Sequence, residues 1–109
     1  MIGVNADRKT LLVDVLFYAS GPGSRSTAPD LSRSLYCPHF IIKGSKNYLG
    51  VRFVDGDTVS LGDWVNAVIE TIYDGVDYGA LLSGGAEFYI AEGGNIVGEG
   101  RVVWVEMNP

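Results

Sequence analysis

This sequence has few cysteines, no long apolar run and almost no basic residue in its second half. No run approaches the ~18 apolar residues that a membrane-spanning helix needs, so we expect no membrane partner. A single cysteine, Cys37, excludes an internal disulfide and is typical of a protein from a reducing cytoplasm. The first residues contain no apolar segment behind a basic flank, which predicts that there is no signal peptide.

Motifs for nucleotide, metal and cofactor binding are also missing. The chain has no G-x-x-x-x-G-K-[ST] loop, and its nearest glycine cluster, SGPGSRST, has no lysine in the phosphate-contacting position. Asp55, Asp57 and Asp63 lack the spacing of a calcium loop and are interpreted as turn residues. We therefore expect no nucleotide, no metal and no cofactor.

The net charge of −5 argues against a general nucleic-acid binder. The charges are nevertheless uneven, because residues 1–53 carry seven basic and three acidic residues, whereas 54–109 carry one basic and ten acidic. Scattered surface charge is one interpretation. The other is a local basic patch around Arg25, Arg33, Lys43 and Lys46.

What the sequence does contain is a series of strand patterns, rich in β-branched and aromatic residues. The predicted strands are 10–19, 35–43, 47–54 and 64–73, followed by a hairpin over 86–105. A short helical turn is expected near 78–83. The intervening stretch 20–34 is dense in Gly, Ser and Pro and must be a loop, long enough to suggest a functional or mobile segment.

Six strands in 109 residues cannot form one open sheet without exposing an apolar face. The sequence therefore predicts an all-β single domain over 1–109, with a core of about 10–106: a closed, six-stranded, antiparallel, Greek-key-like barrel. In the last hairpin, Gly93 and Gly94 suit a tight turn with positive φ at its central residues. Gly98 and Gly100 share a face, where another segment can lie close.

The stretch AEFYIAEGGNIVGEGRVVWV resembles the final hairpin of the third domain of elongation factor Tu, whose pattern includes R-E-G-G-R-T-V-G-A-G-V-V. GSRSTAPDLSRSLYCPHF is similar to the family's G-G-R-x-T-P-x-x-x-G-Y-R-P-Q-F, and SLGDWVNAVIETI to its M-P-G-D segment. The three segments follow the family order over residues 10–105. The resemblance implies the same barrel, here as a stand-alone relative without the GTPase domain.

The family's barrel helps to hold the T-stem of aminoacyl-tRNA and contacts protein partners. By this resemblance and by charge, the candidate partner-binding or RNA-binding residues are Arg25, Thr27, Arg33, Tyr36, His39, Gly94 and Asn95. The chain departs from the family where Cys37 and His39 replace arginine and glutamine, and where Asn95 replaces the arginine after Gly-Gly. These departures remove cations that would meet phosphates.

We expect a cytoplasmic, non-catalytic binding module that engages a protein partner through the 20–34 loop and the adjacent barrel end. The alternative is a tRNA-like RNA-binding module that uses the 20–34 loop and the 92–98 hairpin. A homodimer that pairs through a strand edge opened by Pro38 is a further alternative.

An enzyme built on Cys37 and His39 would need a third group to orient the histidine, and the sequence offers none. Cys37 is therefore expected to be a small buried residue. The two tryptophans and six tyrosines are expected to belong to the core and the barrel ends, with base stacking as the alternative.

Overall fold

Six strands and one short 3₁₀ helix make up the computed structural model, which describes residues 8–106. Residues 1–7, on which the prediction of no signal peptide depends, and residues 107–109 lie outside this range. The strands are β1 (Thr10–Phe17), β2 (His39–Ile42), β3 (Leu49–Gly56), β4 (Trp64–Thr71), β5 (Glu87–Glu92) and β6 (Asn95–Glu106). The 3₁₀ helix, η1, is Gly79–Leu81, as predicted near 78–83. Within residues 8–106, no helix has the length and apolar character needed to cross a bilayer.

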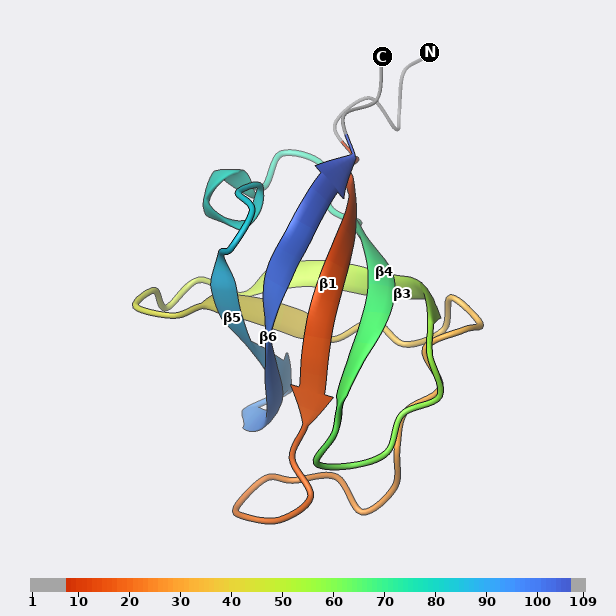
Figure 1. The fold of residues 1–109 in the computed structure, drawn as a ribbon. Helices are drawn as coiled ribbons and strands as arrows, with labels where there is room; N and C mark the ends of the chain where they lie inside the picture. Colours follow the sequence, from red (N-terminus) through yellow and green to blue (C-terminus); the bar gives the residue numbers. More distant parts are fainter. Residues whose placement is uncertain (1–7, 107–109) are drawn as a thin grey trace.

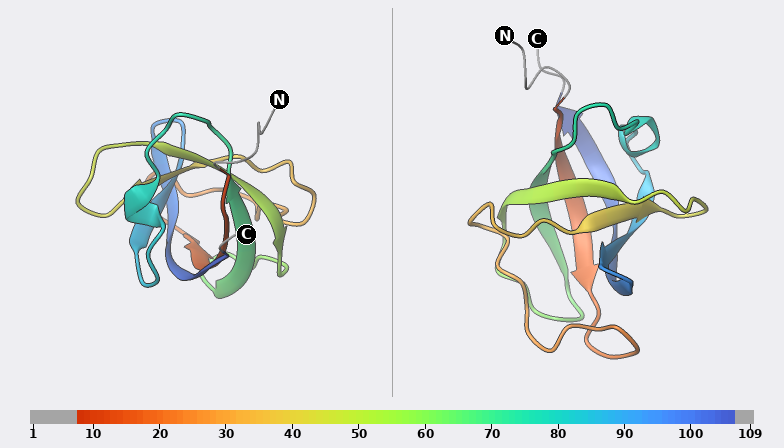
Figure 2. Two further views of the ribbon diagram at one scale, coloured as in Figure 1. Left: turned by 90° about the horizontal axis from the view of Figure 1, so that it is seen from above. Right: turned by 180° about the vertical axis from the view of Figure 1, so that it is seen from behind.

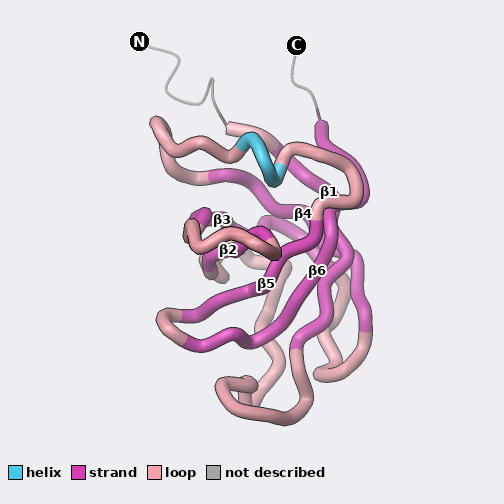
Figure 3. Tube along the Cα trace, turned by 90° about the vertical axis from the view of Figure 1, so that its left-hand side faces the viewer, coloured by secondary structure: helices cyan, strands magenta, loops and turns pink. Residues whose placement is uncertain are grey.

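The strands close into an antiparallel barrel in the order β1-β4-β3-β2-β5-β6, with β6 paired to β1 (Figure 1). The view from above in Figure 2 shows the ring. Strands β2, β3 and β4 follow one another as hairpins and β1 lies beside β4, which makes a Greek key. The predicted fold class is therefore confirmed. The 18–38 segment between β1 and β2, which we call the crossover, runs across one end of the barrel, and η1 lies at the other end (Figure 1 and Figure 3).

Alternation along the strands creates the core. In β1 every second residue is fully buried, and the residues between them are half-buried. Four phenylalanines contribute the largest buried side chains, and the rings of Phe40 and Phe88 stack with centroids 3.9 Å apart. The remaining fully buried side chains of high volume are Leu11, Val13, Val15, Leu31, Val51, Ile69, Leu81 and Ile90. Val97 and Val102 of β6 are buried as well, so the core draws on all six strands, the crossover and η1.

Pro38 shortens the second strand. Only His39–Ile42 forms β2, rather than the predicted 35–43. The register with β3 nevertheless continues upstream, because Val51 N donates to Pro38 O at 3.2 Å and Phe53 N donates to Tyr36 O at 2.9 Å. Pro38 has no N–H to return a bond, which interrupts the ladder. Both sides of β2 are paired, with β3 and β5, so this strand presents no free edge.

A β-bulge in β6 corrects the prediction for the aromatic residues. Leu12 pairs with Trp104 while Val13 pairs with Val102, so Val103 is an extra residue in β6. As a result both Val103 and Trp104 face outward, with exposed fractions of 45% and 58%. The expectation that the aromatics lie in the core or plug the barrel is thus wrong for Trp104. It is also wrong for three other exposed aromatics: Tyr48, Trp64 and Tyr73.

The turn between β5 and β6 needs a positive φ at one of its two central residues rather than at both. Glu92 pairs with Asn95, which leaves Gly93 and Gly94 as the two central residues. Gly93 has a φ of 59°, whereas Gly94 has no positive φ. A positive φ at only the first central position is typical of a type II′ turn, so the predicted requirement holds for Gly93 alone.

Gly98 and Gly100 lie where β6 approaches β1 most closely. A Cβ atom on Gly98 would lie 2.4 Å from Leu16 O, and a Cβ atom on Gly100 would lie 2.5 Å from Asp14 O. The Phe88 ring also occupies the space beside Gly100, with its nearest atom 2.6 Å from that Cβ position. The predicted close approach is confirmed, and only glycine fits at these two positions.

Gly100→Ala should therefore destabilise the protein by about 1–3 kcal/mol, because the new methyl group meets backbone that the β1–β6 ladder holds in place. Gly94→Ala is the matched control, since nothing lies within 4 Å of its Cβ position. Its free energy of unfolding should stay within about 0.5 kcal/mol of the parent protein. Urea unfolding of both variants measures the difference, and equal stabilities would contradict the close approach.

Candidate functional site

The crossover and the β5–β6 turn meet at one end of the barrel. A Cβ atom on Gly23 would lie 3.3 Å from Asn95 Cβ and 3.3 Å from Ile96 O, so the crossover backbone packs directly on the hairpin. Figure 1 shows both segments at the lower end of the molecule. The structure thus brings together two segments that the sequence predicted as parts of one site.

Arg25 is held by several partners at this junction. Its Nη1 forms an ion pair with Glu92 Oε2, and its Nε donates to Thr27 O at 2.9 Å. The guanidinium carbon lies 5.4 Å from the centre of the Tyr36 ring, within cation–π range. Tyr36 Oη donates to the same Glu92 oxygen at 2.5 Å. We call Arg25, Tyr36 and Glu92 the latch, because they tie the crossover to the hairpin.

The chemistry of the latch keeps Tyr36 neutral. Burial, the hydrogen bond to Glu92 and the negative charge of Glu92 all raise the pKa of Tyr36 far above its ordinary value of 10.0, and Arg25 opposes them only in part. The Tyr36 ring also packs on Phe17 and Phe53, with centroid distances of 5.9 and 5.4 Å. The latch therefore joins the surface loop to the aromatic core.

The other predicted cations do not gather beside Arg25. Arg33 pairs with Asp30 at 3.4 Å, within the crossover, and Lys43 pairs with Glu87 and Glu99, each at 3.3 Å. Segment 43–48, which contains Lys43 and Lys46, lies on the opposite side of the barrel from segment 30–36 (Figure 2). The four basic residues are therefore dispersed, and three of them are paired with carboxylates.

Cys37 is exposed, so its predicted burial is wrong. Its neighbours Tyr36 and Pro38 pack toward the barrel, and alternation turns Cys37 outward. The His39 ring contacts the Tyr48 ring edge-on, with centroids 5.7 Å apart. Among residues 8–106 no hydrogen bond joins Cys37 to His39. Nor does that range contain a group of three or more His, Cys, Asp or Glu residues placed to hold a metal ion.

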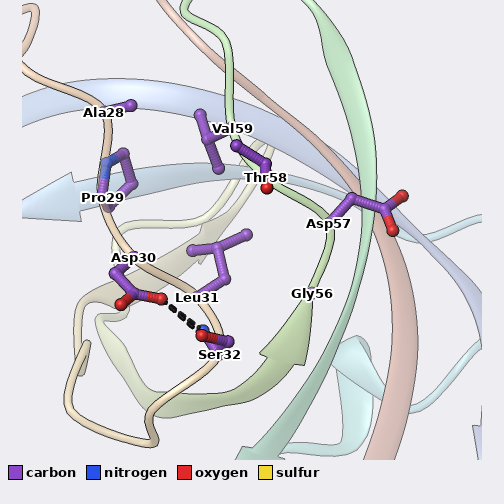
Figure 4. Close-up of a pocket in the computed structure, with 9 residues that line it drawn as sticks. All are labelled: Ala28, Pro29, Asp30, Leu31, Ser32, Gly56, Asp57, Thr58 and Val59. Carbon is purple, nitrogen blue, oxygen red and sulfur yellow. Dashed lines mark hydrogen bonds between the residues drawn. The ribbon is translucent and has the colours of Figure 1, made fainter.

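A hollow of about 430 Å³ opens between the crossover and the segment after β3 (Figure 4). Buried Leu31 and Val59 form its apolar floor. Asp30 shapes its edge, because one carboxylate oxygen accepts hydrogen bonds from Ser32 N at 2.9 Å and Ser32 Oγ at 2.7 Å. The full lining is Ala28, Pro29, Asp30, Leu31, Ser32, Gly56, Asp57, Thr58 and Val59.

Two comparisons with known proteins gave no match that bears on this site. A scan against protein-family models gives no match for this chain. A search of curated proteins likewise finds no match. The likeness to the third domain of elongation factor Tu accordingly stays a prediction from the quoted segments.

Sequence reasoning named Arg25, Thr27, Tyr36 and Asn95 but missed two parts of this region. Glu92 is not among the predicted site residues, although it is the counter-ion of Arg25. Leu31 falls inside a polar loop, and nothing in its surroundings in the sequence indicates that it is fully buried. A search for opposite charges between the two aligned segments would have found Glu92; Leu31 has no comparable signal.

The latch predicts how the free energy of unfolding depends on pH. Because the folded state raises the pKa of Tyr36, its stabilising contribution is complete below pH 10.0 and declines as the pH rises above that value. Above that pH the free energy of unfolding should fall with a slope of up to about 1.4 kcal/mol per pH unit from this one group. Tyr36→Phe should remove that part of the slope.

Urea unfolding between neutral and strongly alkaline pH provides the measurement. Tyr48→Phe is the matched control, since Tyr48 is exposed and lies outside the latch. The role assigned to Tyr36 fails if Tyr36→Phe and Tyr48→Phe change the slope equally.

Proposed function

We propose that this chain is a cytoplasmic, non-catalytic module that binds a protein partner at the crossover end of the barrel. The observation that carries the proposal is the hollow between segments 28–32 and 56–59, with an apolar floor and a polar rim. Protein interfaces have this composition, with apolar residues at the centre and polar residues around them. The hollow is of a size that accepts a side chain or two from a partner.

Rigidity of the crossover supports the same function. The latch, the packing of Gly23 on Asn95 and the burial of Leu31 in the core hold the crossover against the barrel at three places. A loop that is already ordered loses less conformational entropy on binding, which favours affinity. The long glycine-rich segment thus offers a preformed surface.

The distribution of charge favours a protein partner over the alternative, tRNA. Binding to phosphates depends on cations that are free to meet them. Here Arg25, Arg33 and Lys43 are each paired with carboxylates of the same chain. An RNA ligand would have to displace these partners on a protein of net charge −5.

Capture from a lysate of the source cells, with and without ribonuclease, tests the proposal. A stoichiometric protein that survives ribonuclease should be retained by the parent chain and lost, by about tenfold or more, with Ala28→Arg, which fills the hollow. Ala80→Arg is the matched control, because Ala80 is exposed in η1 at the opposite end of the barrel. Equal loss with both variants would contradict a site at the crossover.

The salt dependence of binding distinguishes an RNA ligand from a protein partner. Binding of tRNA, followed by fluorescence anisotropy, should be weak for the parent chain. Tight binding that falls steeply with salt, and that Arg25→Ala with Arg33→Ala abolishes, would overturn the protein-binding proposal.

A further inference from the structure

The hollow at the crossover continues onto the outer face of the barrel. It shares Gly56 and Asp57 with a hollow of about 180 Å³ over β3 and β4. That hollow in turn shares Asp57 and Asn66 with one of about 390 Å³ over β4, β1 and β6. A fourth hollow, of about 170 Å³, shares Trp64 and Arg101 with the hollow of about 390 Å³. Together they form one shallow path, which we call the groove.

Asp57 lies at the junction of the groove, since it lines three of the four hollows. Figure 4 shows its carboxylate pointing away from segment 28–32. Its backbone is fixed, because Asp57 N donates to Asn66 O at 3.1 Å. Within the described residues, its carboxylate has neither a hydrogen bond nor an ion pair. This exposed negative charge is available to a partner.

Trp64 provides an aromatic surface in the groove, and 53% of this residue is exposed. The Arg101 guanidinium lies 5.9 Å from its ring centre and is itself held by Asp14, with Nε and Nη2 at 3.3 and 3.2 Å from one carboxylate oxygen. Asn66 donates to the other oxygen of Asp14. The side chains around Trp64 are thus ordered by one another.

Acidic side chains dominate the groove. Its lining includes six carboxylates and two cations. The carboxylates are Asp14, Asp30, Asp55, Asp57, Glu87 and Glu99, and the cations are Lys43 and Arg101. Four of these carboxylates are paired: Asp14 with Arg101, Asp30 with Arg33, and Glu87 and Glu99 with Lys43. Among the described residues of the groove, the negative charge without an ion-pair partner therefore lies at Asp55 and Asp57, where it attracts a cation.

We propose that the groove binds an extended, basic segment of the partner protein. An apolar side chain of that segment enters the hollow over Leu31, a lysine or arginine pairs with Asp57, and a second cation stacks on Trp64. A succession of small hollows suits an extended chain, whose side chains follow one another every few ångströms. This inference rests on the proposed function, because it specifies the chemistry of the same protein partner.

Nuclear magnetic resonance with a short synthetic peptide tests it. The probe alternates arginine with serine and leucine, and its matched control replaces every arginine with glutamate. The basic peptide should shift the indole N–H resonance of Trp64 and the amide resonances of Asp57 and Asn66. The amide resonance of Ala80, in η1 at the opposite end of the barrel from the crossover, should not move, and the glutamate peptide should shift none of these resonances.

Matched variants distinguish the groove from the overall charge. Asp57→Asn should weaken the affinity for the basic peptide roughly two- to fivefold. Trp64→Ala should weaken it to a similar extent. Asp74→Asn makes the same change of charge in the exposed segment after β4, and Tyr73→Ala removes an exposed aromatic ring that lines none of the four hollows. Both controls should bind as the parent does.

Equal weakening by Asp57→Asn and Asp74→Asn would overturn the groove, since net charge alone would then explain binding. So would basic-peptide binding that leaves the Trp64 resonance unchanged. If a captured protein depends on Ala28 but the basic peptide does not bind, the basic-segment inference fails while the proposed function stands. If neither the lysate capture nor the peptide gives a signal, both fail.

Discussion

The close contact of β6 with β1 at Gly98 and Gly100 is the constraint on which the rest of the structure depends. Without side chains at these positions, the β6 backbone can approach the carbonyl oxygens of β1 and leave room for the Phe88 ring. The contact closes the barrel, so every strand has two neighbours. Closure also holds the β5–β6 turn at the same end of the barrel as the crossover, and this position makes the latch feasible.

The latch then decides what the crossover can do. A loop so rich in glycine, serine and proline would be mobile if nothing fixed it, yet Arg25, Tyr36 and Glu92 join it to the core. The same contacts use the positive charge that an RNA-binding loop would need for phosphates. Ordering of the loop and loss of free cationic charge are therefore two results of one arrangement, and together they favour a protein ligand.

The groove extends from this end across the outer face of the barrel. Outward-facing positions of β1, β4 and β6 alternate with core positions, which leaves Asp14, Asn66 and Arg101 side by side in one row. Trp64 lies two pairs further along, opposite Leu16. The proposed hollow and the proposed basic-segment groove are thus parts of one surface, with an apolar floor at one end and an aromatic side chain at the other.

The sequence alone determined the barrel, because period-2 apolar patterns fix which residues face inward and six such strands need closure to bury them. It also pointed to the glycines of β6 and to the two segments that meet at the crossover. Only the tertiary structure decided the rest. The β6 bulge turned Trp104 outward, the hairpin supplied Glu92 to neutralise Arg25, and the crossover buried Leu31. Each depends on residues far apart in the chain, whose distances no local pattern specifies.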